Sequence, residues 1–197
     1  RRIVKILLFG STGKVGSLVL RLALKRGFEV VCFEGDVRVK SDVENFFSQH
    51  HNADVVISTL GSWGTKTKDI LSCGMTNIIP AMKQHTIRRI ISLTGAETRL
   101  ADDQPTWSSR VLEIVLKIIA PKVYHDGQQH LEMLRDSQLI WTVIRSPKMN
   151  NGSSSHYHLS THCPHAWQQV TRKAVATAIV ESILSIPKLH SPFIASR

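Results

Sequence analysis

The sequence has few cysteines and no paired cysteine motif. Cys32, Cys73 and Cys163 are an odd number in a chain of 197 residues, and no two of them stand in a Cys-x-x-Cys arrangement. A disulfide framework of the kind that holds small secreted domains together is therefore not expected. We interpret the three side chains as reduced thiols, which is typical of a cytoplasmic protein.

The sequence also has no long apolar run. The longest, from Val111 to Ala120, is interrupted by Glu113 and Lys117 and is too short to cross a bilayer. No charged leader followed by an apolar segment and a small-residue cleavage site stands at its start. We expect a soluble cytoplasmic protein without a membrane partner, and we interpret the apolar stripe as core or as a subunit contact.

Acidic residues are few beside the basic ones, 15 against 25, which gives a formal net charge of +10. The Lys and Arg residues are scattered rather than gathered in one stripe, so small anionic ligands are favoured over nucleic acid as partners. The histidines between residues 156 and 165 follow no standard zinc spacing, and no metal is predicted. Because repeats and low-complexity tracts are missing too, we expect one domain over residues 1–197.

A strand, a glycine-rich turn and a helix open the chain. Val4–Phe9 is a nearly continuous apolar run, apolar residues then recur at helical spacing, and Phe28–Phe33 begins a second strand. The GxxGxxG turn between the first strand and the helix predicts a dinucleotide site, because free N–H groups and the helix dipole favour phosphates there. The predicted cofactor-binding residues of this turn are Gly10, Ser11, Thr12, Gly13, Lys14, Val15 and Gly16.

Strands and helices alternate along the rest of the chain. Further strands are predicted over residues 54–61, 89–95 and 141–147, and helices over 41–50, 65–84, 107–120, 123–137 and 171–186. This alternation predicts an α/β fold with a doubly wound parallel sheet, a Rossmann fold, and a short C-terminal substrate-side extension in which residues 148–170 are the candidate segment. Ligands bind beyond the carboxyl ends of such strands, so these residues should join the glycine turn: Thr59, Leu60, Gly61, Thr94, Ser146 and Pro147.

Several motifs resemble one known family. The stretches "KILLFGSTGKVG", "DVVISTLG", "GMTNIIPAMKQHTIRRIISLTGA" and "LRDSQLIWTVIRSPKM" resemble atypical short-chain dehydrogenases/reductases, in particular the NmrA-like and biliverdin reductase B (flavin reductase) branch. The resemblance spans nearly the whole chain. It implies an NAD(P)-binding Rossmann domain, and it implies that Asp36 and Val37 of "EGDV" close a third strand beside the adenine.

The stretch "VVCFEGDV" is shorter than this resemblance requires. Family members carry further residues between the second strand and the Gly-Asp-Val triplet, whereas here Phe33 is followed directly by Glu34. Two alternatives are open, a loop missing from the sequence or a true deletion, and we expect the loop, with no peptide bond between residues 33 and 34. The Arg that usually reads the 2′-phosphate is absent. NADP is the expected cofactor because of the basic charge and Lys14, with NAD as the alternative.

The resemblance also implies which chemistry is missing. Members with ordinary dehydrogenase activity use a Tyr-x-x-x-Lys pair, but here Gln128 stands four residues after Tyr124 and Thr161 four residues after Tyr157. Thr94 stands where the family often has a Ser, and Gly95 replaces a second one. Thr94 is therefore one candidate catalytic residue. Tyr124 and His130 are the other two, because the helix that carries them is expected near the nicotinamide.

Two function classes follow from this set. The expected one is a reductase passing hydride to a flavin, a quinone or a similar small conjugated acceptor, because such transfer needs mainly stacking and can take its proton from water. The alternative is a non-catalytic redox sensor of the NmrA-like type, which binds NAD(P) and acts through a protein partner.

Overall fold

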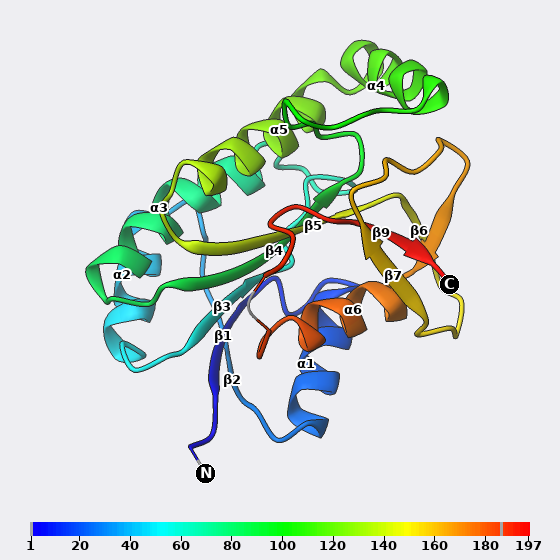
Figure 1. Cartoon of the computed structure of the whole chain (residues 1–197). Helices are drawn as coiled ribbons and strands as arrows, with labels where there is room; N and C mark the ends of the chain where they lie inside the picture. The colour runs from blue at the N-terminus through cyan, green and yellow to red at the C-terminus, as the bar shows by residue number, and fades with distance from the viewer. Residues whose placement is uncertain (1, 186) are drawn as a thin grey trace.

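A seven-stranded sheet forms the centre of the molecule (Figure 1). The computed structural model describes residues 2–185 and 187–197. The strands lie in the order β2-β1-β3-β4-β5-β9-β7, and only the pairing of β7 with β9 is antiparallel. Their bounds are Lys5–Phe9 (β1), Glu29–Cys32 (β2), Val55–Ser58 (β3), Arg89–Gly95 (β4), Ile140–Ser146 (β5), Tyr157–Ser160 (β7) and Phe193–Ser196 (β9).

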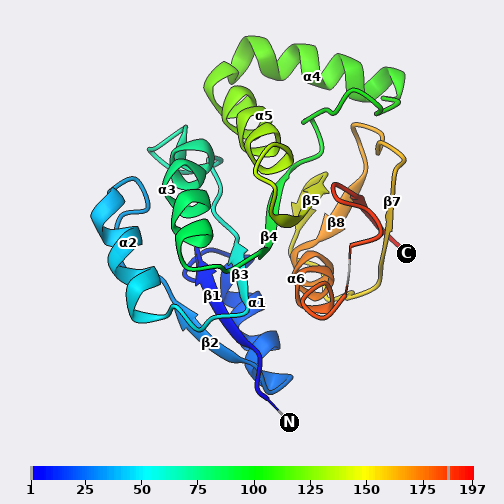
Figure 2. The ribbon, with the colours of Figure 1, turned by 60° about the vertical axis from the view of Figure 1, so that its left-hand side comes forward.

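Helices cover both faces of this sheet, as Figure 2 shows. Helix α1 (Gly16–Lys25) and helix α6 (Arg172–Glu181) share a core with one face. Helices α2 (Lys40–Gln49), α3 (Ile70–Gln84) and α5 (Pro121–Arg135) cover the other. Because both faces are covered, the side chains from Ile6 to Phe9 have no exposed surface, which explains the continuous apolar run of β1. The predicted doubly wound α/β fold is confirmed.

Helix α4 (Trp107–Ile119) lies outermost and packs against α5 (Figure 2). Its apolar stripe is largely exposed, and of its apolar side chains only Leu116 is buried. The exposed members are Trp107, Val111, Ile114, Val115, Ile118 and Ile119. The stripe is thus not core in this chain. Among the described residues, no helix is long and apolar enough to cross a membrane.

The expected third strand is not formed. The chain runs without a break from β2 through residues 33–39 into α2, so the expected interruption between Phe33 and Glu34 is wrong. The N–H of Phe33 still donates to the Leu8 carbonyl, at 2.9 Å, after which the chain leaves the sheet. Because α2 itself provides the crossover to β3, no further strand is needed, and β2 becomes the edge of the sheet.

The C-terminal part contains strands that the sequence patterns did not predict. Strands β6 (Lys148–Asn150) and β8 (Gln169–Thr171) form a separate parallel pair, while β7 and β9 extend the main sheet beyond β5. The helix predicted over 171–186 ends at Glu181 in α6, and residue 186 lies outside the described residues. Residues 148–170 are thus short strands and loops beside β5 rather than a separate lid.

Candidate functional site

The glycine turn closes tightly between β1 and α1. Gly10 has a φ of +82°, a conformation that favours glycine, and the N–H of Gly13 donates to its carbonyl at 3.1 Å. A Cβ built on Gly16 would lie 1.9 Å from the Gly10 carbonyl oxygen, so only glycine lets the helix start this close to the strand. The turn therefore depends on Gly10 and Gly16 in the way that the motif predicts.

The outer side of this turn is open and offers hydrogen-bond donors. Thr12, Gly13 and Lys14 are exposed, and a Cβ on Gly13 would meet nothing closer than the Gly10 carbonyl oxygen at 3.3 Å. No residue among those described accepts a hydrogen bond from the N–H groups of Thr12, Lys14 or Val15, and no side chain caps α1. Free N–H groups at a helix N-terminus bind phosphate, so the turn fits the pyrophosphate of a dinucleotide.

Thr59 joins the end of β3 to this turn. Its hydroxyl donates to the carbonyls of Phe9 and Gly10, at 3.0 and 3.1 Å, and the next two residues, Leu60 and Gly61, are progressively more exposed. The sheet register pairs Ser58 with Ser92, and β4 continues beyond this point to Gly95, so Thr59 follows β3 beside the last residues of β4. This carboxyl edge of the sheet therefore brings together the predicted residues of the glycine turn, β3 and β4.

Asp36 and Val37 lie in the connection from β2 to α2 and not in a strand. Val37 is buried, and its carbonyl accepts a hydrogen bond from Asn77 at 2.9 Å. Asp36 forms an ion pair with Arg38 at 2.6 Å, and the hydrogen bonds from Arg38 lower the pKa of Asp36 to about 2. Because no further strand intervenes, Glu34 and Asp36 follow the carboxyl end of β2 directly, which corrects the assignment of Asp36 to a later strand.

Thr94, Ser146 and Pro147 end the next two strands of the same edge. Thr94 and Ser146 are buried, and the Ser146 hydroxyl donates to the Pro147 carbonyl at 2.9 Å. Helix α5 approaches here through Gly127, whose added Cβ would lie 3.0 Å from Thr94 Oγ1. The structure thus brings Thr94 to the edge that carries the glycine turn.

Tyr124 is held by α4 rather than presented to a ligand. Its hydroxyl donates to Glu113 Oε1 at 3.0 Å, and Lys117 Nζ lies 4.9 Å from its ring centroid. Burial, followed by the hydrogen bond to Glu113, raises the pKa of Tyr124. A catalytic tyrosine of the Tyr/Lys type needs a lowered pKa, so this environment works against that role.

His130 lies inside the core between α5 and β4. It has no exposed surface, its Nε2 is 2.8 Å from Ser92 Oγ, and burial lowers its pKa to about 4. The imidazole is therefore neutral at pH 7. In the structure described, it does not reach the carboxyl edge as a group that touches a substrate.

One acidic residue at this edge was missed by the sequence patterns. A Cβ built on Gly95 would lie 2.1 Å from Oε2 of Glu97, which means that the carboxyl group folds back over the end of β4. Burial raises the pKa of Glu97 above its ordinary value of 4.5, and the indole of Trp63, from the loop after β3, lies close enough to lower it slightly. Because no motif marks a lone Glu two residues after a strand, only the fold reveals this group.

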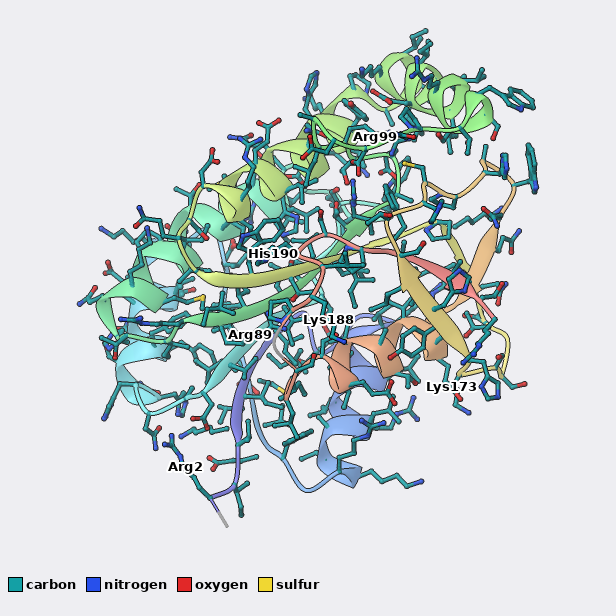
Figure 3. All side chains as sticks on the ribbon, in the orientation of Figure 1. Arg2, Arg89, Arg99, Lys173, Lys188 and His190 are labelled. Carbon is teal, nitrogen blue, oxygen red and sulfur yellow. The ribbon has the colours of Figure 1, made fainter. Side chains whose placement is uncertain are left out.

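Two shallow hollows lie away from the carboxyl edge. One, of about 420 Å³, is at the opposite edge of the sheet among Arg2, Asp54 and Arg89, and the other, of about 510 Å³, lies between β7 and α6. Figure 3 shows Arg2 and Arg99 at opposite ends of the molecule. In the first hollow, Arg89 already donates to Thr142 and to the Ser182 carbonyl. Because both hollows lie away from the glycine turn, we assign neither to the cofactor.

A family described as NAD(P)H-binding matches residues 29–185. The chain belongs to this NAD(P)H-binding family. The matched segment begins after the glycine turn, so the family and the turn are two independent indications of the same cofactor class. This confirms the NAD(P)-binding family that the sequence motifs predicted, and the NmrA-like or biliverdin reductase B branch stays a prediction.

Solved structures of similar fold agree with this NAD(P)H-binding family. A short-chain dehydrogenase/reductase from Veillonella parvula, solved in complex with NADP, is 20% identical, with a TM-score of 0.76 over 99% of this chain and 95% of that chain. ChuY of Escherichia coli, described as an anaerobillin reductase, is 20% identical, with a TM-score of 0.78 over 98% and 97%. The oxidoreductase YlbE of Lactococcus lactis is 18% identical, with a TM-score of 0.78 over 98% and 91%. At these identities the likeness shows the fold.

Proposed function

We propose that this protein is an NAD(P)H-dependent reductase that passes hydride to a flavin, a quinone or a similar planar conjugated acceptor. The observation that carries this proposal is the glycine turn, which is open at Gly13 and has free N–H donors at the start of α1. The description of the neighbour ChuY as a reductase supports the reductive direction.

The chain's own residues provide binding and orientation. The N–H groups of Thr12, Lys14 and Val15 would hold the pyrophosphate, while Thr59 fixes the turn from β3. When bound, the reduced nicotinamide supplies hydride. A planar conjugated acceptor is favoured over a simple alcohol or ketone because Tyr124 is bonded to Glu113 and no Tyr-x-x-x-Lys pair exists. We assign residues 148–170, which border the end of β5, to the acceptor side.

For the 2′ position we propose NADP, because Lys14 in the turn and the net charge of +10 favour an additional phosphate. NAD is the second candidate on one observation. Glu34 is the second residue after β2, and a carboxylate at that position favours a free ribose hydroxyl and repels a phosphate. Titration with both reduced cofactors decides between them.

The test of this function combines binding with turnover. Calorimetric titration with NADPH and NADH should show binding, and Gly13→Asp should abolish it because a carboxylate would stand where the pyrophosphate must lie. Gly13→Ala is the matched control, since its Cβ meets only one atom, at 3.3 Å, and should keep the fold and most of the binding. The wild type should then reduce flavin mononucleotide or menadione well above the uncatalysed rate. Equal affinity in Gly13→Asp and wild type would contradict the cofactor site.

A non-catalytic redox sensor is the second candidate function. It is favoured by the exposed apolar face of α4, where Trp107 is 71% and Ile118 74% exposed, because such a face suits a protein partner. A sensor would bind the nucleotide with normal affinity and reduce none of the acceptors. Turnover by the wild type therefore separates the two functions.

A further inference from the structure

The loop after β4 holds one carboxyl group firmly over the end of its strand. The N–H and the hydroxyl of Thr98 both donate to the Gly95 carbonyl, at 3.3 and 2.9 Å, and the N–H of Ala96 donates to Ser146 at 2.9 Å. These bonds turn the chain back at Gly95. The side chain of Glu97 consequently fills the space that a side chain at position 95 would take.

Trp63 reaches the same carboxyl group from the neighbouring strand's loop. It lies close enough to Glu97 to lower the pKa of that carboxyl group, yet 56% of its surface is exposed. An indole beside a carboxyl group and largely exposed offers a face on which a flat ring can stack. Trp63 and Glu97 therefore stand together at the carboxyl edge, a few residues along the chain from Thr59, which contacts the glycine turn.

The charges around Glu97 come mainly from one residue. Arg99 lies in the same loop and lowers the pKa of the carboxyl group, as Trp63 does, but burial raises that pKa by more than both lower it. Arg99 is itself fixed by α5, because its N–H donates to Gln128 Oε1 at 2.9 Å, and by Glu113 of α4 at 3.5 Å. Its Nη2 is buried and finds no hydrogen-bond partner among the described residues. Arg99 is thus held in place with a free donor.

We propose that Glu97 is the proton donor of the reduction and that Trp63 is the surface on which the planar acceptor stacks. This inference rests on the proposed reductase function and adds the source of the proton. Burial keeps part of the Glu97 population protonated at higher pH than an exposed carboxyl group, which suits a general acid. The carboxyl group supplies what the incomplete tyrosine pair does not.

The step balances with two transfers. The acceptor receives one hydride, which leaves the nicotinamide oxidised, and one proton from the Glu97 carboxyl group, which leaves a carboxylate. The acceptor is thereby reduced by two electrons and gains two hydrogens. Water then returns a proton to Glu97, so no other oxidant or reductant is needed.

The first test removes the proton without changing the shape. Glu97→Gln should lower kcat roughly 100-fold with menadione, while NADPH affinity stays within twofold of the wild type. The wild-type rate should fall as the pH rises through the pKa of Glu97, and this limb should be missing in Glu97→Gln and retained in Glu97→Asp. Glu44→Gln, the same change on the remote helix α2, should leave kcat unaltered.

The second test displaces the carboxyl group from outside. A Cβ at position 95 would collide with the end of the flexible Glu97 side chain, so Gly95→Ala should push the carboxyl group away and lower kcat while the protein stays folded. Combined with Glu97→Gln, it should add little further loss, because both changes remove the same donor. Full additivity of the two losses would count against the assignment.

A third measurement does not depend on turnover. Oxidised flavin mononucleotide should quench tryptophan fluorescence on binding, and Trp63→Ala should weaken this binding roughly tenfold, with Trp63→Phe between the two. Carbon-13 titration of Glu97 should give a pKa above 4.5. A Glu97 pKa at or below that value, flavin binding unaffected by Trp63→Ala, or unchanged kcat in Glu97→Gln would overturn the inference while the reductase function stands. Absence of turnover in the wild type, with NADPH bound, would overturn both.

Discussion

Asp126 on α5 and Ser72 on α3 are joined by two hydrogen bonds across 54 positions of the sequence, from the Ser72 N–H at 2.8 Å and from its hydroxyl at 2.7 Å. The Leu71 N–H donates to the same carboxylate at 3.1 Å. Helix α3 has no cap from its own N-terminal residue, so α5 provides one. This contact fixes the start of α3 against α5.

Removing that carboxylate should be costly. Asp126→Ala leaves three donors without their acceptor in the interior, and we expect the free energy of unfolding to fall by about 3 kcal/mol. Chemical denaturation followed by circular dichroism measures it. Asp102→Ala, at an exposed position of a loop, should change stability by less than about 0.5 kcal/mol. Similar losses in both variants would contradict the capping role.

Gly16 should tolerate no side chain. Its Cβ would lie 1.9 Å from the Gly10 carbonyl oxygen, a backbone atom that cannot move without opening the turn. We expect Gly16→Ala to lower the melting temperature by several degrees and to weaken NADPH binding at least tenfold. Gly61→Ala, where nothing lies within 4 Å of the added carbon, serves as the stability control.

Stability should fall in mild acid because of His130. Its pKa is about 4 in the folded protein against an ordinary value of 6.5. At a pH between these two values, the histidine is protonated in the unfolded chain and neutral in the folded protein. The free energy of unfolding should consequently drop by about 2 kcal/mol from pH 7 to pH 5 on account of this residue. Urea titrations of His130→Gln should lack this contribution, whereas His125→Gln, on the exposed side of α5, should retain it.

The buried pair of Arg145 and Asp103 gives a further test. Arg145 is 2% exposed, its Nη2 donates to Asp103 Oδ1 at 2.8 Å, and its guanidinium lies 3.7 Å from the Phe193 ring. Asp103→Ala should cost about 3 kcal/mol, because it leaves a buried cation unpaired. Adding Arg145→Met should recover part of that loss in thermal denaturation. A double variant no more stable than the single one would contradict this account.

Much of the fold was predictable because its signals are local. The apolar run of β1, the GxxGxxG turn and the helical spacing that follows all arise within a short stretch, and β4 was predicted with its observed bounds, Arg89–Gly95. Strands β6 to β9 have three or four residues each, as β3 does, but β6, β7 and β8 mix polar and apolar residues and so lack the apolar run that marks β3. Their partners are distant in the sequence.

Sequence patterns could propose residues only for the cofactor half of the candidate site. A phosphate turn has a fixed spacing, whereas Glu97 is a single acidic residue whose position depends on how the loop after β4 turns back over Gly95. The family resemblance suggested Tyr124 and His130, and these side chains are instead occupied by Glu113 and Ser92. These tertiary contacts, which sequence patterns do not reveal, keep Tyr124 and His130 from contacting a ligand.

The edge position of β2 allows residues to be inserted into the sequence beside it. One side of β2 pairs with β1, the other meets no strand of the described residues, and residues 33–39 leave the sheet directly there. Extra chain inserted after Phe33, even a whole strand, would add to the rim of the sheet and leave the order of β1, β3 and β4 intact. The nucleotide-binding half of such a domain can therefore gain or lose residues at this rim, while the edge that carries Glu97 and the glycine turn keeps its geometry.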